Sequence, residues 1–393
     1  MNFHSINRII HLSTPKNWRG GEQQIAYLAT ELDNQQIKQT VLSPANSSLF
    51  NFIKKYKEEN VTTNLEVEVL KGNSKFGQAK FLASFCAKNQ VDIVHLHDAH
   101  AHTIAVLSAV FFQNKSKFIL SRRVDFPVKN NFFSTYKYNH WSIKKIICVS
   151  DKIKEITSPS IKDKSKLITV HSGIDLKKFD TEKFSNSNEK EKTSILKTEY
   201  NLEKDTILIG NVAALAPHKD YITFLETAKI LIPTLAKREK EEHTHRKVCF
   251  FLIGKEDGSE NEIQNWLNQN QEIKRYFILT GFRNDISIIL KELAVFLFTS
   301  QTEGLGTSIL DAFASKVVVV ATAAGGIPES VIDNQTGLLS KIKDSVSLAK
   351  NVEKVLYDEE LRNRLINNAT IHLQNFTKEN TAKKTLEIYN YVC

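Results

Sequence analysis

Short apolar runs alternate with amphipathic stretches along most of the chain. An apolar run at 7–13 precedes a glycine pair and then apolar positions at helical spacing over 22–32, and this order of strand and helix recurs. Strands are expected at 7–13, 39–42, 65–70, 92–96, 117–120, 145–149, 166–170, 206–212, 247–253, 277–280, 295–299 and 317–322. Helices are expected at 22–32, 49–59, 75–89, 221–231, 262–270, 285–291, 308–315 and 379–391. Such alternation predicts parallel sheets with helices on both faces.

A polar stretch at 180–197 interrupts the alternation and suits a linker or a surface helix. A chain of 393 residues is long enough for two domains. We therefore predict an α/β fold of two doubly wound, Rossmann-like domains that face each other across a cleft, at 1–184 and 185–375. The helix at 376–393 is expected to pack back on the first domain. Ligands in such folds bind at the carboxyl ends of the strands.

The composition excludes several classes of protein. Hydrophobic residues make up 41% and charged residues 25%, which is unlike a disordered or fibrous chain. The longest apolar stretches, at 104–112 and 317–324, are shorter than the roughly 20 residues that span a bilayer. The first fifteen residues lack a secretory pattern, so a cytoplasmic protein is expected. The 4 cysteines lie far apart, which predicts reduced thiols and no zinc site.

The positive charge is concentrated in the first half. The net charge is +9, with 27 basic and 16 acidic residues in 1–184 against 26 and 28 in 185–393. Segment 115–166 has 13 basic and 4 acidic residues, interleaved with Phe118, Phe126, Phe132, Phe133, Tyr136, Tyr138 and Trp141. This pattern allows a cationic aromatic surface for anionic lipid or nucleic acid, or a solvated face whose aromatics point into the core. Because no nucleic-acid module is recognised, no nucleic-acid partner is expected.

The most informative motif follows the strand at 295–299. Glu303 leaves this strand, and Gly304 and Gly306 permit close approach of the backbone to a ligand. Sugar hydroxyls donate to a carboxylate, whereas a diphosphate binds backbone N–H groups at a helix N-terminus. A turn of this kind suits a nucleotide-sugar.

The helix after this turn adds further candidates. Thr307 or Ser308 can cap its first turn, and Asp311 lies one turn inside it, near enough to receive another hydroxyl. A second glycine loop, at 323–328, follows the next strand, and Glu329 comes directly after it.

Segment 300–339 resembles the signature of family 4 of the retaining glycosyltransferases. The match consists of an acidic residue, seven residues, a second acidic residue, a strand of small residues and a G-G-x-P-E loop. Further segments that resemble this family lie at 18–22, 92–102, 170–179, 211–220 and 281–285. The resemblance implies the two-domain GT-B fold, a nucleotide-diphosphate sugar as donor, retention of anomeric configuration, and no cofactor or divalent metal.

The resemblance also implies roles for individual residues. Glu303, Lys219 and His100 are the expected catalytic groups: Glu303 holds the sugar, Lys219 stabilises the leaving diphosphate, and His100 contacts the sugar. The expected donor-binding residues are Gly304, Leu305, Gly306, Thr307, Asp311, Arg283, Gly325 and Gly326. The expected acceptor or phosphate loop contains Gly20, Gly21, Arg122 and Arg123.

Three positions depart from the family pattern. Asp311 stands where the family usually has Glu, and Ala214 stands where it has an Arg beside the residue matching Lys219. Arg283, Arg122 and Arg123 are the candidates to supply that missing charge. The family His after the fifth strand is absent from segment 121–127, which makes His100 the candidate for the sugar contact.

Four histidines, His95, His97, His100 and His102, lie close together in the sequence. His95 and His97 alternate along a strand and share one face, with Asp98 adjacent, which raises the question of a metal site. The apolar surroundings of His95 favour a hydrogen-bonded residue of the core or cleft wall, and we expect no metal.

Together these observations predict a hexosyltransferase that moves a sugar from a nucleotide-sugar donor to a glycan or lipid-linked acceptor, as in lipopolysaccharide, capsule or other envelope polysaccharide synthesis. The first domain is expected to bind the acceptor and the second the donor. Peripheral contact with the anionic inner face of the cytoplasmic membrane is also expected. The alternative is a protein that binds a nucleotide-sugar without transferring it.

Overall fold

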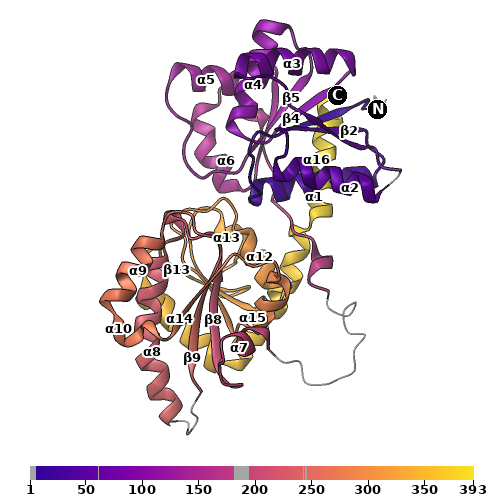
Figure 1. Cartoon of the computed structure of the whole chain (residues 1–393). Coiled ribbons are helices and arrows are strands. Elements are labelled where there is room, and N and C mark those ends of the chain that lie inside the picture. Colours follow the sequence, from indigo (N-terminus) through magenta and orange to yellow (C-terminus); the bar gives the residue numbers. More distant parts are fainter. Residues whose placement is uncertain (1–5, 61, 181–193, 242, 244–245) are drawn as a thin grey trace. The chain divides into compact units, whose positions relative to one another are not determined.

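The computed structural model describes residues 6–60, 62–180, 194–241, 243 and 246–393. The chain divides into two compact units (Figure 1). Unit 1 contains the chain up to Ile174 together with Phe376–Cys393, and unit 2 contains Asp175–Asn375. The predicted boundary between 184 and 185 falls within 181–193, outside the described residues.

Unit 1 is built on a seven-stranded parallel sheet in the order β3-β2-β1-β4-β5-β6-β7. Its strands are β1 (Ile9–Leu12), β2 (Gln39–Ser43), β3 (Leu65–Val69), β4 (Ile93–Leu96), β5 (Lys117–Arg122), β6 (Ile143–Cys148) and β7 (Leu167–Thr169). Its helices are α1 (Gly20–Asn34), α2 (Ser48–Glu59), α3 (Lys75–Lys88), α4 (Ala99–Phe112), α5 (Phe132–Asn139), α6 (Asp151–Thr157) and α16 (Lys378–Val392). The strand order reverses between β1 and β4, so loops that follow these two strands diverge there.

Helices cover both faces of this sheet. Side chains of α3, α4 and α6 form one core with the sheet, and side chains of α1 and α16 pack on the other face. The C-terminal helix α16 buries Ile388 and Tyr389 in that second core, and Lys378 pairs with Glu31 of α1 at 3.0 Å. The predicted return of the C-terminal helix to the first domain is confirmed.

Unit 2 is built on a six-stranded parallel sheet in the order β10-β9-β8-β11-β12-β13. Its strands are β8 (Ile207–Val212), β9 (Val248–Ile253), β10 (Phe277–Gly281), β11 (Val295–Phe298), β12 (Val318–Thr322) and β13 (Leu338–Ser340). Its helices are α7 (Ile195–Glu199), α8 (Tyr221–Glu241), α9 (Glu260–Gln269), α10 (Gln271–Lys274), α11 (Ile286–Ile289), α12 (Thr307–Ala314), α13 (Ile327–Ser330), α14 (Ser345–Tyr357) and α15 (Glu359–His372). The order reverses between β8 and β11.

The predicted strands are all present, and the predicted fold class of two doubly wound parallel sheets is confirmed. Helices α4, α5 and α6 go beyond the predicted pattern, as do the elements between Thr322 and Glu379. Helix α4 has no charged side chain apart from histidine and buries half of its residues, so it lacks the polar face by which an amphipathic helix is recognised. No helix in the described part of the chain is both long and apolar enough to span a membrane. All four cysteines are free thiols, as predicted.

Candidate functional site

Three loops of unit 2 meet at the carboxyl ends of β8, β11 and β12, which are neighbours in the sheet. Hydrogen bonds fix these loops to one another: the Thr299 hydroxyl donates to the carbonyl of Asp220 at 3.0 Å, and the Thr322 hydroxyl donates to the carbonyl of Ser300 at 2.5 Å. The Gln301 amide donates to the carbonyl of His218 at 2.9 Å. The reversal of strand order thus creates a fixed platform, which is the usual ligand position in open α/β sheets.

An ion pair stands on this platform. The Lys219 ammonium lies 2.5 Å from Oε2 of Glu303, and the two side chains are only 14% and 17% exposed. The Ser300 hydroxyl donates to the same carboxylate at 3.4 Å, and the ammonium lies 5.0 Å from the centre of the Phe298 ring. The sequence placed Lys219 and Glu303 84 residues apart, and the structure brings both predicted groups to one point.

The N-terminus of α12 lies directly after Glu303. Its N-cap residue is Gly306, which has a φ of +80°, and no side chain caps the helix. The expectation that Thr307 or Ser308 caps it is therefore wrong: Thr307 is the first helical residue, and a left-handed backbone at the cap position makes the turn. The uncapped amides are left available to a negatively charged ligand.

The second glycine loop supports Glu303 from behind. The Gly326 amide donates to the Glu303 carbonyl at 2.9 Å. Gly325 has a φ of +53°, and a Cβ atom there would lie 2.0 Å from the same carbonyl oxygen. The sequence predicted Gly325 and Gly326 as donor-binding residues, and the structure places them against the backbone of Glu303. Leu305 is anchored similarly, because its carbonyl accepts from the Ser330 hydroxyl at 2.9 Å.

Asp311 lies on α12 and is half-buried. Its partial removal from water raises the pKa of this carboxyl to about 7, although the Lys178 ammonium acts in the opposite direction. A carboxyl group in this state changes its charge near neutral pH. It can then accept a hydroxyl hydrogen bond as a carboxylate or donate one as an acid.

Arg283 is placed away from this platform. Its guanidinium pairs with Glu199 and Asp285, each at 2.7 Å, and these two carboxylates raise its pKa further. It follows β10, which is three strands from β11, so at about 4.8 Å per strand the two loops start about 14 Å apart. Arg283 therefore ties α7 to the end of β10, and its predicted donor contact is not tested by this geometry.

The corresponding position in unit 1 carries the predicted loop residues. Gly20 and Gly21 form the first turn of α1, and a Cβ atom at either would meet no atom within 4 Å. The tight turn alone therefore does not demand glycine there. The buried Glu22 accepts a hydrogen bond from the Arg19 amide at 3.1 Å, and burial raises the pKa of its carboxyl. His100, in the first turn of α4, is exposed.

A network of neutral histidines fills the adjacent interior. Nδ1 of His11 lies 3.1 Å from Nε2 of His97, and His95 lies 2.5 Å from the Tyr389 hydroxyl and 2.8 Å from that of Ser121. Burial lowers the pKa of His11 to about 4 and the pKa values of His95 and His97 well below the usual range. One nitrogen of each ring lies within 4.8 Å of the others, a spacing that suits a metal ion.

The contacts of this network speak for hydrogen bonding rather than metal binding. Each ring nitrogen of His95 already has a partner, and the Arg123 guanidinium lies 3.5 Å from Nδ1 of His97. A positive charge beside the rings opposes a bound cation. Arg123 itself is desolvated, which lowers its pKa to about 10. That no metal is bound stays a prediction.

The other candidates of unit 1 have structural partners. The Arg122 guanidinium donates to the Tyr138 hydroxyl at 2.7 Å and to the carbonyl of Phe126. Asp98 caps α4 and also accepts from the amide and hydroxyl of Thr14 at 2.8 and 2.7 Å, which joins the loops after β1 and β4. The buried His102 lies 3.1 Å from the Lys137 carbonyl oxygen, and burial lowers its pKa to about 3.

Two residues of the unit 1 network are absent from the predicted set, His11 and Tyr389. His11 lies in the predicted strand 7–13 as His95 lies in 92–96, but only the structure shows that these strands pair in parallel with His11 opposite His95. Tyr389 had no signal in the sequence, since its contact with His95 spans 294 residues and depends on where α16 packs.

Two family models match the chain, and both describe glycosyltransferases. Residues 18–178 match the model "Glycosyltransferase Family 4", and residues 192–372 match "Glycosyl transferases group 1". Between them they account for most of unit 1 and unit 2.

Curated relatives point to the same class of enzyme. The chain is 25% identical over 323 residues to N,N'-diacetylbacillosaminyl-diphospho-undecaprenol alpha-1,3-N-acetylgalactosaminyltransferase of Campylobacter jejuni, covering 79% of this chain and 80% of the relative. It is 27% identical over 239 residues to UDP-Gal:alpha-D-GlcNAc-diphosphoundecaprenol alpha-1,3-galactosyltransferase of Escherichia coli, covering 58% of this chain and 57% of the relative.

Solved structures show the same fold. A glycosyltransferase from Rickettsia africae superposes with a TM-score of 0.81 at 20% identity, covering 99% of each chain. Anabaena HepE in complex with UDP superposes with a TM-score of 0.76 at 17% identity, covering 98% of this chain and 100% of HepE. The predicted GT-B fold is thereby confirmed, and the chain belongs to the glycosyltransferases in which a family 4 domain is followed by a group 1 domain.

Proposed function

We propose that this enzyme transfers a sugar from a nucleotide-diphosphate sugar, a UDP-sugar by preference, to a lipid-linked glycan of the cell envelope, with retention of configuration. The observation that carries this proposal is the Lys219–Glu303 pair beside the uncapped N-terminus of α12. The names of the two relatives given above, which include undecaprenol-linked acceptors and a UDP-galactose donor, support the choice of substrates.

Glycosyl transfer develops negative charge on the departing diphosphate, so the site must stabilise that group. The Lys219 ammonium and the first amides of α12 supply positive charge at one point. When the donor enters, the ammonium can leave Glu303 for the phosphate oxygens, since both side chains are partly exposed. The two groups then have separate partners, and neither charge remains unpaired.

Glu303 then becomes free to accept hydrogen bonds from the sugar hydroxyls. The Gly326 amide and the left-handed Gly325 fix its backbone, so the carboxylate is preorganised before the donor binds. In this proposal Glu303 orients the sugar, and the acceptor attacks on the face from which the diphosphate departs. A diphosphate oxygen takes the proton of the attacking hydroxyl.

Lys219 and the helix amides together take the part that a divalent cation plays in other sugar transfers, so we propose that no metal is needed. Ala214 leaves Lys219 without the second cation of the family pattern. The amides of α12 make up part of that loss, because an uncapped helix N-terminus carries about half a positive charge.

The test combines a donor panel with lipid-linked acceptors. We expect one UDP-sugar among UDP-, GDP-, ADP- and CMP-sugars to be consumed, with equal turnover in EDTA and with product whose anomeric configuration, read by NMR, equals that of the donor. Donor binding without transfer to any acceptor would favour the binding-protein alternative. Inverted product or loss of turnover in EDTA would contradict the mechanism.

A further inference from the structure

One segment of unit 1 exposes an unusual number of large hydrophobic side chains. Phe132 and Phe133 open α5 and are 77% and 81% exposed. The other exposed large hydrophobic residues between 124 and 141 are Val124, Phe126, Tyr136 and Trp141. The structure thus divides the aromatics of the basic region: Phe118 is fully buried and Tyr138 half-buried, whereas the aromatics at the start of α5 face solvent. Clustered exposed aromatics indicate an interaction surface.

The packing of α5 does not use these rings. No residue of α5 is fully buried. The half-buried Tyr138 packs against the core of unit 1, the Lys137 ammonium donates to the Thr103 hydroxyl at 3.1 Å, and the Asn139 amide donates to the Ser160 carbonyl at 2.9 Å. The Phe132 ring contacts the Phe133 ring edge-on and stacks on the Tyr136 ring, so the three rings form a cluster of their own. The helix is held by Tyr138, Lys137 and Asn139, and it exposes Phe132, Phe133 and Tyr136.

The charges around α5 are mostly positive. Residues 99–150 contain eight Lys and Arg but a single carboxylate, Asp125, and residues 69–91 of the α3 region contain four Lys and no carboxylate. Helices α3 and α5 both contact α4. On the opposite face of the sheet, α1, α2 and α16 all carry Glu side chains. Helices α3, α4 and α5 therefore carry no acidic side chain, whereas α6, on the same face, carries Asp151 and Glu155.

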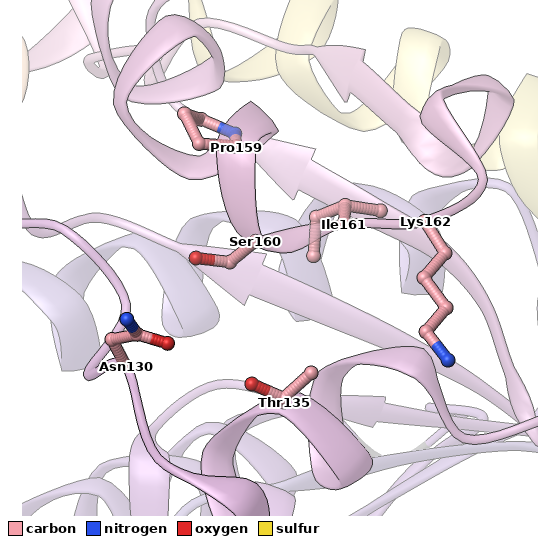
Figure 2. Close-up of a pocket in the computed structure, with 6 residues that line it drawn as sticks. All are labelled: Asn130, Thr135, Pro159, Ser160, Ile161 and Lys162. Atoms are coloured by element: carbon pink, nitrogen blue, oxygen red, sulfur yellow. The ribbon is translucent and has the colours of Figure 1, made fainter.

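A polar pocket of about 430 Å³ adjoins the aromatic cluster (Figure 2). It is lined by Asn130, Thr135, Pro159, Ser160, Ile161 and Lys162. The hydroxyls of Thr135 and Ser160, the amide of Asn130 and the ammonium of Lys162 surround it (Figure 2). Donors of this kind suit a phosphate-bearing headgroup, whereas an acyl chain would have to displace their water without replacing its hydrogen bonds.

We propose that residues 124–141 dock unit 1 on an anionic lipid bilayer. Phe132 and Phe133 enter the boundary between headgroups and acyl chains, Lys129 and Lys144 lie at the headgroup level, and the polar pocket receives a headgroup phosphate. Exposed aromatics together with an excess of positive charge match an anionic bilayer, whose acyl boundary takes the rings and whose headgroups pair with the lysines. The purpose of this docking, which is to bring the enzyme to a lipid-linked acceptor, rests on the proposed function. The docking itself does not.

Sedimentation of the full chain with vesicles tests this proposal without donor or acceptor. We expect binding to vesicles of 70% phosphatidylcholine and 30% phosphatidylglycerol, and loss of binding at 500 mM salt or with phosphatidylcholine alone. Phe132→Ser with Phe133→Ser is expected to weaken binding about tenfold or more. Lys129→Gln with Lys144→Gln is expected to weaken it about 25-fold, at roughly fivefold for each charge.

A matched control is Ile371→Ser with Tyr391→Ser, because these side chains are 72% and 78% exposed and lie outside the segment. A Phe133→Trp variant measures how deeply this side chain enters the bilayer. We expect acyl-brominated lipid to quench the fluorescence of the introduced tryptophan. Equal binding of the Phe double variant and the native chain would overturn the proposal, as would equal loss in the control. Conversion of a native dimer into a monomer by the Phe double variant, or its loss of RNA binding with vesicle binding intact, would do the same.

Discussion

Each sheet reverses its strand order once, and the side chains gathered at the two reversals differ in charge. In unit 2 the loops after β8 and β11 hold Lys219 and Glu303 as a largely buried ion pair. In unit 1 the strands β1 and β4 hold His11, His95 and His97 as buried rings with lowered pKa values. The same kind of strand-order reversal therefore carries a charged site that a ligand can reorganise in unit 2. In unit 1 it carries a neutral network that fixes the strand ends.

The largest effect on transfer is expected from substitutions in the Lys219–Glu303 pair of unit 2. Glu303→Gln and Lys219→Met should each reduce transfer about 100-fold or more, because each removes a group that acts on the developing charge or on the sugar. Steady-state turnover of the preferred donor measures this. The matched controls are Glu360→Gln and Lys350→Met, which change exposed residues of the same unit. If the site variants keep native turnover, the ion pair has no part in transfer.

The buried neutral histidines of unit 1 should make the free energy of unfolding fall as the pH is lowered. The pKa of His11 falls from 6.5 to about 4 on folding and that of His102 to about 3. The unfolded chain thus binds more protons below pH 6.5. For each such histidine the free energy of unfolding should therefore fall by about 1.4 kcal/mol per pH unit, from pH 6.5 down to its folded pKa.

Denaturant unfolding between pH 7 and 4 measures this slope. His102→Gln should reduce it, and His100→Gln should leave it unchanged, because His100 is exposed on the same helix. A native chain that is equally stable at pH 7 and pH 4.5 would show that these histidines are not buried in the neutral form.

One glycine in each unit allows a second comparison between the two units. Gly325→Ala in unit 2 places a Cβ against the Glu303 carbonyl at a positive φ, and should cost about 1–3 kcal/mol of stability together with most of the turnover. Gly20→Ala in unit 1 meets open space within α1, and should leave stability unchanged or raise it by up to about 1 kcal/mol. Thermal unfolding compares the two variants. Equal destabilisation would mean that Gly20 is also required by the fold.

The smallest effect is expected at Asp311. Its carboxyl has a pKa of about 7, so donor affinity should rise as pH increases through 7 if the carboxylate accepts a hydroxyl of the donor. Asp311→Asn should remove this dependence and lower affinity about tenfold at pH 8, the cost of one charge-assisted hydrogen bond. Calorimetric titration from pH 6 to pH 8 measures it, and an unchanged profile in the variant would exclude this contact.

The strands and the turn at Glu303 could be predicted from the sequence because both are local signals. Apolar runs mark each buried strand, and Glu303, Gly306 and Asp311 lie within nine residues. Helix α4 was not predicted because it has no distinct polar face. The uncapped N-terminus of α12 could not be foretold either, since Thr307 and Ser308 are favourable cap residues and only the left-handed Gly306 displaces them.

Long-range contacts explain the remaining differences. The bond between His95 and Tyr389 depends on the docking of α16, and the ion pairs of Arg283 with Glu199 and Asp285 depend on where α7 meets the end of β10. Neither follows from spacing in the sequence. Exposure of Phe132 and Phe133 was left open by the sequence because an aromatic residue at helical spacing can face either the core or solvent.

The central claim is that the donor binds at the carboxyl ends of β8, β11 and β12 in unit 2. Amide hydrogen exchange of the native chain, with and without a saturating UDP-sugar, tests this claim most directly. We predict protection in peptides that cover 217–220, 300–308 and 323–327, with the greatest change at the first amides of α12. Binding that protects none of these segments would contradict the account.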